Sequence, residues 1–141
     1  MNNWLYDGAA FDGPTNHKEQ MGFVYLITHL SSGKKYIGKK LFWFKKTKQV
    51  KGKKKRVLSE SDWRTYYSSS VELQEWVERE GEECFQREIL YICQSKGMMN
   101  YLEAREQMDR RVLENQDIYL NGQIQVRVHH THIKDPRKYR A

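Results

Sequence analysis

The chain has 141 residues, and its 25 lysines and arginines exceed its 18 aspartates and glutamates, for a formal net charge of +7. This length has room for one domain but not for a second folded module. The basic excess is concentrated at residues 45–56 and again at residues 129–140. Such asymmetry favours a polyanionic partner, but charge alone does not separate a nucleic-acid binder from an ordinary basic protein.

Other features of the composition narrow the class of protein. No apolar run approaches the ~20 residues of a membrane span, and the N-terminus lacks the pattern of a signal peptide. Cys84 and Cys93 are too few for a disulfide framework or a four-ligand zinc site, so buried thiols are expected. We therefore expect a soluble, cytoplasmic protein.

The first predicted element is a hairpin. Residues 1–20 lack periodicity and are interpreted as an N-terminal arm packed by its aromatic side chains. The run Gly22–His29 is apolar and rich in β-formers, and a second such run spans Lys35–Phe44. Turn chemistry at Ser32 and Gly33 joins the two runs into an antiparallel hairpin.

A basic segment and a helix follow. Residues 45–56 cannot bury themselves and contain a glycine, so they are interpreted as a mobile surface loop. Ser69 and Glu72 have capping-box spacing, and the apolar positions behind them predict a helix from Ser70 to Glu80. Gly81 ends this helix.

The remaining pattern adds one strand and one helix. Residues 84–93 alternate and then become apolar on both faces, which predicts a strand inside the sheet. Residues 97–114 predict a longer helix, and residues 124–128 a last short strand or extended segment. The apolar side of the longer helix is formed by Met98, Met99, Leu102 and Leu113.

Two tyrosine-bearing segments make the interpretation more specific. They are Gly22-Phe-Val-Tyr25 and Lys35-Tyr36-Ile37-Gly38, whose tyrosines at 25 and 36 are eleven positions apart. The pair resembles the signature of the GIY-YIG nuclease superfamily. Similarity to its phage-encoded, homing-endonuclease-like branch extends over about Gly22 to His132, through Tyr36-Ile-Gly-Lys-Lys40, Trp63-x-x-Tyr66-x-Ser68-Ser69-Ser70, Phe85 to Leu90, Glu103-Ala-Arg-Glu106-Gln and Tyr119-x-Asn121.

The resemblance implies an α+β fold, a small three-stranded antiparallel sheet flanked by helices. Residues 21–133 are expected to form the nuclease domain, with the basic loop inside it and a basic tail at 134–141. The implied activity is metal-dependent hydrolysis of phosphodiester bonds by a phage-encoded DNA endonuclease, in the host cytoplasm.

Phosphodiester hydrolysis needs a deprotonated water, neutralised phosphoryl oxygens and a stabilised leaving group, and a phenol, a cation and a metal divide these tasks. Tyr25 is the candidate general base, assisted by Tyr36, because a nearby cation and a divalent ion lower a phenol pKa from its usual ~10. The alternative is a pair of strand tyrosines packed on the core. Asn121 resembles a late asparagine that supports the glutamate, or else is a turn residue beside Gly122.

The expected cofactor is Mg²⁺ or Mn²⁺. Because magnesium is held by only one or two carboxylates, a single helix glutamate suffices. The resemblance places this ligand at Glu103, which we favour, whereas the helical wheel puts Glu106 nearer the core. Either carboxylate also fits an ordinary solvated helix face with arginines nearby.

The chain departs from the family pattern at the basic residue of the site. Most members of the superfamily carry an arginine on the first helix, and this chain has no arginine at the matching position. Lys40 and Arg64 are the proposed substitutes, although each also fits a plain surface cation. Phosphate contacts, which set affinity without reading sequence, are assigned to Lys39, Lys45, Lys46, Lys48, Lys51, Lys53, Lys54, Lys55, Arg56, His132 and Arg137.

The expected partner is double-stranded DNA. One small active site cuts one strand, so a double-strand break needs a homodimer on the DNA or sequential nicking. Three alternatives stay open: a catalytically inactive DNA-binding domain of the same fold, a basic phage protein that binds an acidic protein, and a related site that acts on repair intermediates or recombination junctions.

Overall fold

The computed structural model describes residues 2–133, so the predicted tail at 134–141, with Arg137, lies outside the described residues. Two helices, α1 (Val71–Glu80) and α2 (Lys96–Asp109), and four short 3-10 turns accompany the strands in this part of the chain. The strands are β1 (Trp4–Tyr6), β2 (Ala9–Ala10), β3 (Gly22–His29), β4 (Lys35–Leu41), β5 (Trp43–Val50), β6 (Lys53–Glu60) and β7 (Phe85–Cys93).

The main sheet has five strands in the order β2-β1-β7-β3-β4, and it is mixed because β1 runs parallel to β7. The α+β class and the antiparallel core of β7, β3 and β4 agree with the expectation, but a three-stranded sheet was too small. The added strands come from the N-terminal arm, whose Trp4–Tyr6 pairs with Arg87–Ile89. A three-residue strand has no local periodicity, and a partner more than eighty residues away in the chain cannot be recognised from sequence pattern.

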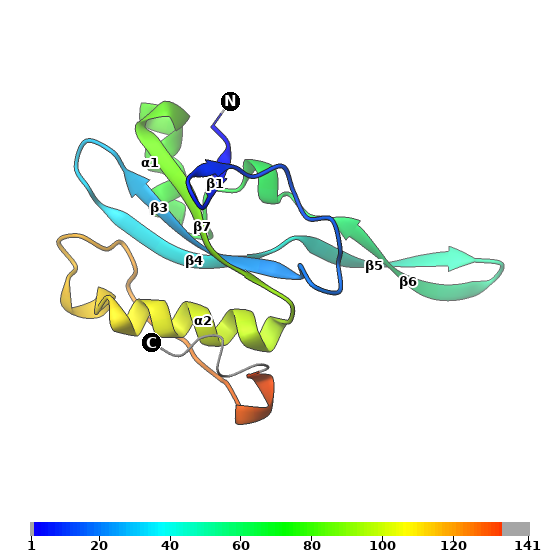
Figure 1. The fold of residues 1–141 in the computed structure, drawn as a ribbon. Coiled ribbons are helices and arrows are strands. Elements are labelled where there is room, and N and C mark those ends of the chain that lie inside the picture. Colours follow the sequence, from blue (N-terminus) through cyan, green and yellow to red (C-terminus); the bar gives the residue numbers. More distant parts are fainter. Residues whose placement is uncertain (1, 134–141) are drawn as a thin grey trace.

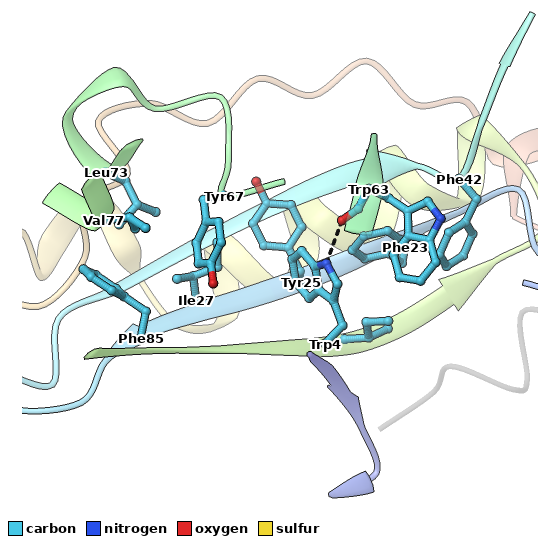
Figure 2. Close-up of a cluster of buried hydrophobic side chains, with 11 residues drawn as sticks. Trp4, Phe23, Tyr25, Ile27, Phe42, Trp63, Tyr67, Leu73, Val77 and Phe85 are labelled. Atoms are coloured by element: carbon cyan, nitrogen blue, oxygen red, sulfur yellow. Dashed lines mark hydrogen bonds between the residues drawn. The ribbon is translucent and has the colours of Figure 1, made fainter. Parts of the chain in front are cut away.

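The sheet is covered on both faces. In Figure 1, α1 and α2 lie on opposite sides of it, and the central strand β3 is buried along almost its whole length. On the α1 side, Trp4, Phe23, Phe42 and Trp63 form an aromatic cluster in which the indole of Trp4 donates to the carbonyl of Trp63 at 2.7 Å (Figure 2). A second cluster, on the α2 side, includes Met98 and Leu102 of the predicted apolar helix face.

Both predicted helices form, with shifted ends. The side-chain oxygen of Ser70, and not that of Ser69, accepts from the backbone nitrogen of Leu73 and caps α1, which ends at Gly81 with a φ of 97°. The helix α2 ends at Asp109, earlier than predicted, because Arg111 adopts a left-handed φ of 51°. Leu113 therefore lies beyond the helix and is exposed.

The basic segment at 45–56 is not the irregular loop that was expected. It lies in a two-stranded hairpin whose register runs from Trp43 opposite Glu60 to Val50 opposite Lys53. Lys51 and Gly52, both with positive φ, make its two-residue turn, which is the geometry that favours tight hairpins. Figure 1 shows this hairpin projecting away from the sheet.

Two further observations complete the fold. Residues 124–128 form no strand, so the last short strand expected there is wrong. Across residues 2–133, neither helix is long and apolar enough to cross a membrane.

Candidate active site

A cavity of about 400 Å³ opens at the free edge of β4, the last strand of the sheet. Side chains from both faces of the sheet reach it, together with α2 and the segment that follows Tyr119. Its lining is Tyr25, Tyr36, Gly38, Lys39, Tyr66, Ser69, Glu103, Gln107, Asn121, Gly122, Gln123 and Gln125. Four residues expected to be catalytic, Tyr25, Tyr36, Glu103 and Asn121, are therefore brought together here.

The glycine of the second motif lets Tyr25 reach this cavity. Tyr25 of β3 lies directly opposite Gly38 of β4, so both belong to the same face of the sheet. A Cβ atom at Gly38 would collide with the phenol ring and hydroxyl of Tyr25. The ring therefore crosses over β4 in the space that a side chain at position 38 would occupy.

Tyr25 is only 1% exposed. Burial raises its pKa well above the usual value, and the phenols of Tyr66 and Tyr36, a hydrogen bond to Tyr66 and the charge of Glu103 raise it further. The expectation that neighbouring cations lower this pKa is wrong for the chain without metal or substrate. Tyr25 carries its proton at neutral pH in that state.

Tyr66 is the tyrosine that sequence reasoning did not assign to the site. Its ring lies 6.0 Å from that of Tyr25, edge to face, while the ring of Tyr36 stacks on Tyr25 at 6.3 Å. Burial raises the pKa of Tyr66 as well. The run Tyr66-x-Ser68-Ser69 carries part of the family resemblance, and this resemblance is the sequence signal that could have assigned Tyr66 to the site. Ser69 of the same run also lines the cavity, with its hydroxyl 3.5 Å from that of Tyr36.

Lys40 does not line the cavity. Its ammonium lies 2.6 Å from the carboxylate of Asp62 and 4.2 Å from the centre of the Tyr66 ring. Lys40 therefore contacts Tyr66 outside the cavity lining. The hydrogen bond from Lys40 lowers the pKa of Asp62.

Lys39, expected only to contact DNA, is the cation in the lining of the described cavity. Its ammonium donates to the side-chain oxygen of Asn100 at 2.5 Å and lies 3.6 Å from the carboxylate of Glu103. Successive residues of a strand point to opposite faces, which explains why Lys39 and Lys40 have different surroundings.

Glu103 of α2 is the acidic residue of the cavity. Its side chain is 14% exposed, and burial raises its pKa while Lys39 partly lowers it. A desolvated carboxylate with one ammonium nearby favours additional positive charge. No cluster of three or more potential metal ligands exists among residues 2–133, but Mg²⁺ needs only one or two protein carboxylates and takes water and phosphate oxygens for the rest. The residues present therefore fit a divalent ion at Glu103.

Glu106 does not reach the cavity. One of its carboxylate oxygens accepts from the hydroxyl of Tyr91 at 2.7 Å, and the other pairs with the guanidinium of Arg110 at 2.8 Å. One oxygen thus joins α2 to β7, and the other forms an i,i+4 pair at the end of α2.

Asn121 lines the cavity but neither supports Glu103 by a hydrogen bond nor serves as a simple turn residue. Its side chain accepts from the backbone nitrogen of Ile37 at 3.0 Å and donates to the carbonyl of Ile37 at 2.7 Å. It therefore takes the place of a neighbouring strand at the open edge of β4. Two residues before Asn121, Tyr119 forms a parallel β-bridge with Lys35 of the same strand edge.

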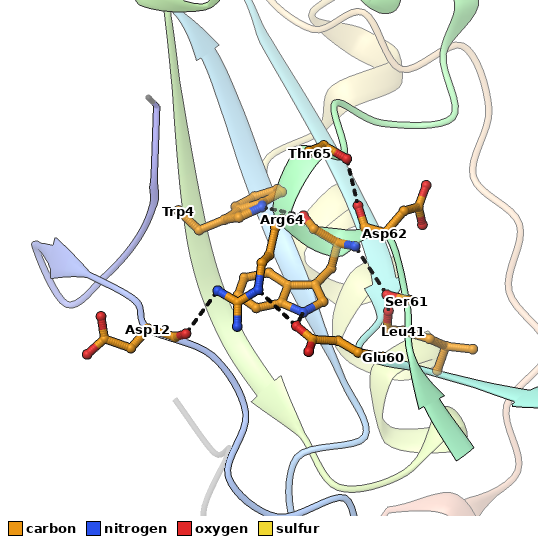
Figure 3. A network of polar contacts seen from close by, with 9 residues as sticks. Trp4, Asp12, Leu41, Glu60, Ser61, Asp62, Arg64 and Thr65 are labelled. Atoms are coloured by element: carbon orange, nitrogen blue, oxygen red, sulfur yellow. Dashed lines mark hydrogen bonds and ion pairs between the residues drawn. The ribbon is translucent and has the colours of Figure 1, made fainter. Parts of the chain in front are cut away.

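Arg64 lies away from the cavity. Figure 3 shows its guanidinium between the carboxylate of Glu60, at 2.9 Å, and the carbonyl of Asp12, at 3.0 Å. Its charged group also lies over the ring of Trp63. Arg64 therefore fastens the end of β6 to the N-terminal arm.

The other predicted DNA contacts lie outside the cavity lining. Lys45 to Arg56 belong to the projecting hairpin, and His132 is exposed in the 3-10 turn His130–His132, where its ring accepts from the backbone nitrogen of His129 at 3.0 Å.

Comparison with known proteins identifies the family of the chain. The family model described as "Putative endonuclease segE, GIY-YIG domain" matches residues 4–124. No curated protein and no solved structure matches the chain. The matched range includes β1, both signature motifs, α2 and Asn121, which is most of the described fold and all of the cavity lining except Gln125. The chain belongs to the GIY-YIG nuclease superfamily, in the branch of the segE endonuclease domain.

Proposed function

We propose that this protein is a DNA endonuclease that hydrolyses phosphodiester bonds in the cavity at the edge of β4. One observation carries the proposal. Two motif tyrosines, a lysine and a desolvated glutamate from separate stretches of chain meet in a single opening. Packing alone does not require a buried carboxylate beside an ammonium and three phenols.

The residues divide the reaction as follows. Lys39 faces the phosphoryl oxygens of the bound strand, and Tyr25 orients the attacking water and accepts its proton, with Tyr36 and Tyr66 holding the phenol in place. Glu103 holds Mg²⁺ or Mn²⁺. When bound, such an ion neutralises phosphoryl oxygens and favours deprotonated oxygen nucleophiles.

The raised pKa of Tyr25 makes this role dependent on positive charge and on pH. Only the ionised phenol can accept the proton of the attacking water, and the ionised fraction grows as pH rises, so the cutting rate should increase into the alkaline range. If the residual cutting by Tyr25→Phe increases with pH as steeply as cutting by the parent chain, the group that titrates is not Tyr25.

The direct test is relaxation of a supercoiled plasmid with Mg²⁺ or with EDTA. Tyr25→Phe should reduce the cutting rate at least ~100-fold, in the range typical of a lost acid-base group. Glu103→Gln should reduce it by at least ~100-fold as well, because the ion loses its carboxylate ligand. Glu106→Gln is the matched control, because Glu106 lies one turn further along α2 and contacts Tyr91 and Arg110 instead of the cavity. Equal losses in both glutamate variants would overturn the assignment of Glu103.

A second candidate is a DNA-binding domain of this fold that does not cut. The observation that favours it is the absence of an arginine from the lining of the described cavity. A chain that binds duplex DNA but leaves linear, branched and supercoiled substrates intact with Mg²⁺ and Mn²⁺ would establish this second function. We include a phage origin and a homing role in the proposal on the basis of the sequence resemblance alone.

A further inference from the structure

The hairpin of β5 and β6, residues 43–60 and called the basic hairpin below, is charged on both faces. Adjacent cross-strand pairs point to opposite sides of a two-stranded ribbon, so the register shows which side chains share a face. One face carries Lys45, Thr47, Gln49, Lys54, Arg56 and Leu58. The opposite face carries Lys46, Lys48, Val50, Lys53, Lys55 and Val57.

This arrangement is not explained by folding. Residues 44–58 are all exposed, so neither face covers a core. Glu60 is the single acidic residue of the basic hairpin and pairs with Arg64. Within residues 2–133, none of the eight cations from Lys45 to Arg56 has an ion pair. Lys48 lies directly opposite Lys55, a like-charge pair that destabilises a hairpin.

The base of the hairpin is nevertheless fixed to the domain. The indole of Trp43 donates to the carbonyl of Gln20 at 2.9 Å. The backbone nitrogen of Ser61 donates to the carbonyl of Phe42 at 2.8 Å. Arg64 and Glu60 add the network of Figure 3. In Figure 1 the hairpin continues the course of β4 away from the sheet, so the cations are presented in a defined direction.

We propose that the basic hairpin enters the major groove of B-form DNA close to the phosphodiester bond that the cavity receives. The inference rests on the proposed function, which supplies DNA as the substrate. A two-stranded ribbon fits the ~12 Å width of the major groove but not the ~6 Å minor groove. A groove also has a row of phosphates on each side, which suits a ribbon with cations on both faces. A protein that lies against one side of a duplex needs cations on one face only.

The two faces differ in what they can recognise. Arg56 and Gln49 share a face, and their side chains match the edges of guanine and adenine in the major groove. The basic residues of the opposite face are all lysines, which act as point charges on flexible stems and suit phosphates. With the ribbon standing between the two phosphate rows, Arg56 and Gln49 are therefore the side chains suited to reach base edges, and the opposite face contacts phosphates only.

The strand geometry sets the distance between this contact and the cut. Thr47, in the middle of β5, lies nine positions after Gly38, at the cavity. At ~3.3 Å per residue this corresponds to at most about 30 Å, because the chain bends at Phe42 between the two strands. At ~3.4 Å per base pair, that is at most about nine base pairs along the duplex. Contacts of the hairpin should therefore lie within about one helical turn of the cleaved bond.

The first experiment measures binding separately from cutting. The full chain with Glu103→Gln is titrated, in EDTA and at several salt concentrations, with a mixed-sequence duplex. A second protein has residues 45–58 replaced by Asn-Gly, which keeps the pairs Trp43–Glu60 and Phe44–Ser59. Its affinity should fall at least ~30-fold, and its salt slope should decrease by ~0.9 for each phosphate that the shortened hairpin no longer neutralises. Unchanged thermal unfolding would confirm that the domain itself is intact.

Chemical protection identifies the groove. Dimethyl sulfate methylates guanine N7 in the major groove and adenine N3 in the minor groove. We expect the hairpin to protect N7, and the shortened variant to leave N7 unprotected. Protection of N3 alone, unchanged affinity of the shortened variant, or equally tight binding of a polyglutamate peptide, which would point to an acidic protein partner, would each overturn the proposal.

A charge-conserving pair tests the assignment of the faces. Arg56→Lys and Lys55→Arg change neighbouring residues on opposite faces and leave the net charge unaltered. In selection from a random duplex library, Arg56→Lys should weaken the preference at one position at least ~10-fold. Lys55→Arg should leave all preferences as they are. Equal effects of the two changes, or none, would overturn the orientation.

The outcomes also separate this inference from the proposed function. A protein that protects N7 through its hairpin but never cuts DNA refutes the nuclease and leaves the hairpin contact intact. A protein that cuts DNA, and whose shortened variant binds DNA equally well, confirms the nuclease and refutes the hairpin contact.

Discussion

Gly38 is the residue whose missing side chain shapes the candidate active site. Replacing it with alanine puts a methyl group into the position of the Tyr25 phenol. Overpacking of this kind costs typically about 1–3 kcal/mol. We expect Gly38→Ala to lower stability by that amount, and to reduce the cutting rate at least ~100-fold because a small displacement of a reacting group is costly. Urea unfolding and plasmid relaxation measure the two effects.

Gly122→Ala provides the comparison for stability. An added Cβ there meets no atom within 4 Å, although Gly122 also lines the cavity. Its stability should therefore stay within ~0.5 kcal/mol of the parent chain, as for ordinary surface changes. If Gly38→Ala cost no more than Gly122→Ala, Tyr25 would not occupy the space over β4.

The raised pKa of Glu103 predicts a pH-dependent stability difference. Because the pKa is raised on folding, the contribution of this carboxyl to stability is present below the ordinary value of 4.5 and lost as pH rises through the folded-state pKa. The stability of Glu103→Gln relative to the parent chain should therefore increase as pH rises above 4.5 and then level off. Unfolding by urea across this range measures the trend, and a decreasing difference would contradict the burial effect.

The sequence motifs predict which residues line the cavity better than they predict what each residue contacts there. Tyr25, Tyr36, Glu103 and Asn121 meet as the resemblance implied, but the cation is Lys39 instead of Lys40 or Arg64. A strand pattern assigns Lys40 to the same face as Tyr25. It does not reveal that the Tyr25 ring crosses the strand at Gly38, which opens the site to side chains from the other face.

At the scale of elements, the open edge of β4 depends on Asn121. The side chain is 3% exposed and makes both backbone hydrogen bonds to Ile37. Each buried backbone group left without a partner costs about 1–3 kcal/mol. The carbonyl of Ile37 also accepts from the side-chain amide of Gln107 at 3.2 Å, so Asn121→Ala leaves only the nitrogen of Ile37 without a partner and should lower the free energy of unfolding by about 1–3 kcal/mol, measured in urea.

The conservative change Asn121→Asp separates the two hydrogen bonds. A carboxylate can still accept from the nitrogen of Ile37 but cannot donate to its carbonyl, and burying its charge has a desolvation cost, so Asn121→Asp should be at least as destabilising as Asn121→Ala at neutral pH. The loss should be smaller at low pH, where the protonated carboxyl can donate. If both variants were as stable as the parent chain but failed to cut, Asn121 would act on the substrate instead of on the strand.

Elements with a strong local pattern are the ones that sequence predicts well. The β3 strand, α1 and β7 form close to their expected bounds because apolar periodicity and capping residues act over a few neighbours. The basic hairpin was missed because its stability comes from cross-strand pairing and the Lys51-Gly52 turn, with no alternation of apolar side chains. The burial of Trp4 was also missed, because its contacts with Phe23 and Trp63 join segments that are far apart in the chain.

At the scale of the whole molecule, the fold presents one candidate cavity with the motif tyrosines, and the basic hairpin extends to one side of it. One such site can hold one phosphodiester at a time. We therefore expect the protein to nick a supercoiled plasmid first, with the open circle accumulating before any linear product. Gel analysis of a time course at protein concentrations below those that favour self-association measures the order of products.

The concentration dependence decides between a monomer and a homodimer on DNA. Sequential nicking by monomers makes the early rate of nicking proportional to protein concentration and leaves the open circle as the main intermediate. A dimer that cuts both strands in one encounter makes linear DNA without that intermediate, and its early rate rises with the square of concentration. Because the basic hairpin supplies each monomer with its own DNA contact, we expect the first behaviour. Linear product formed from the start would show that two copies act together.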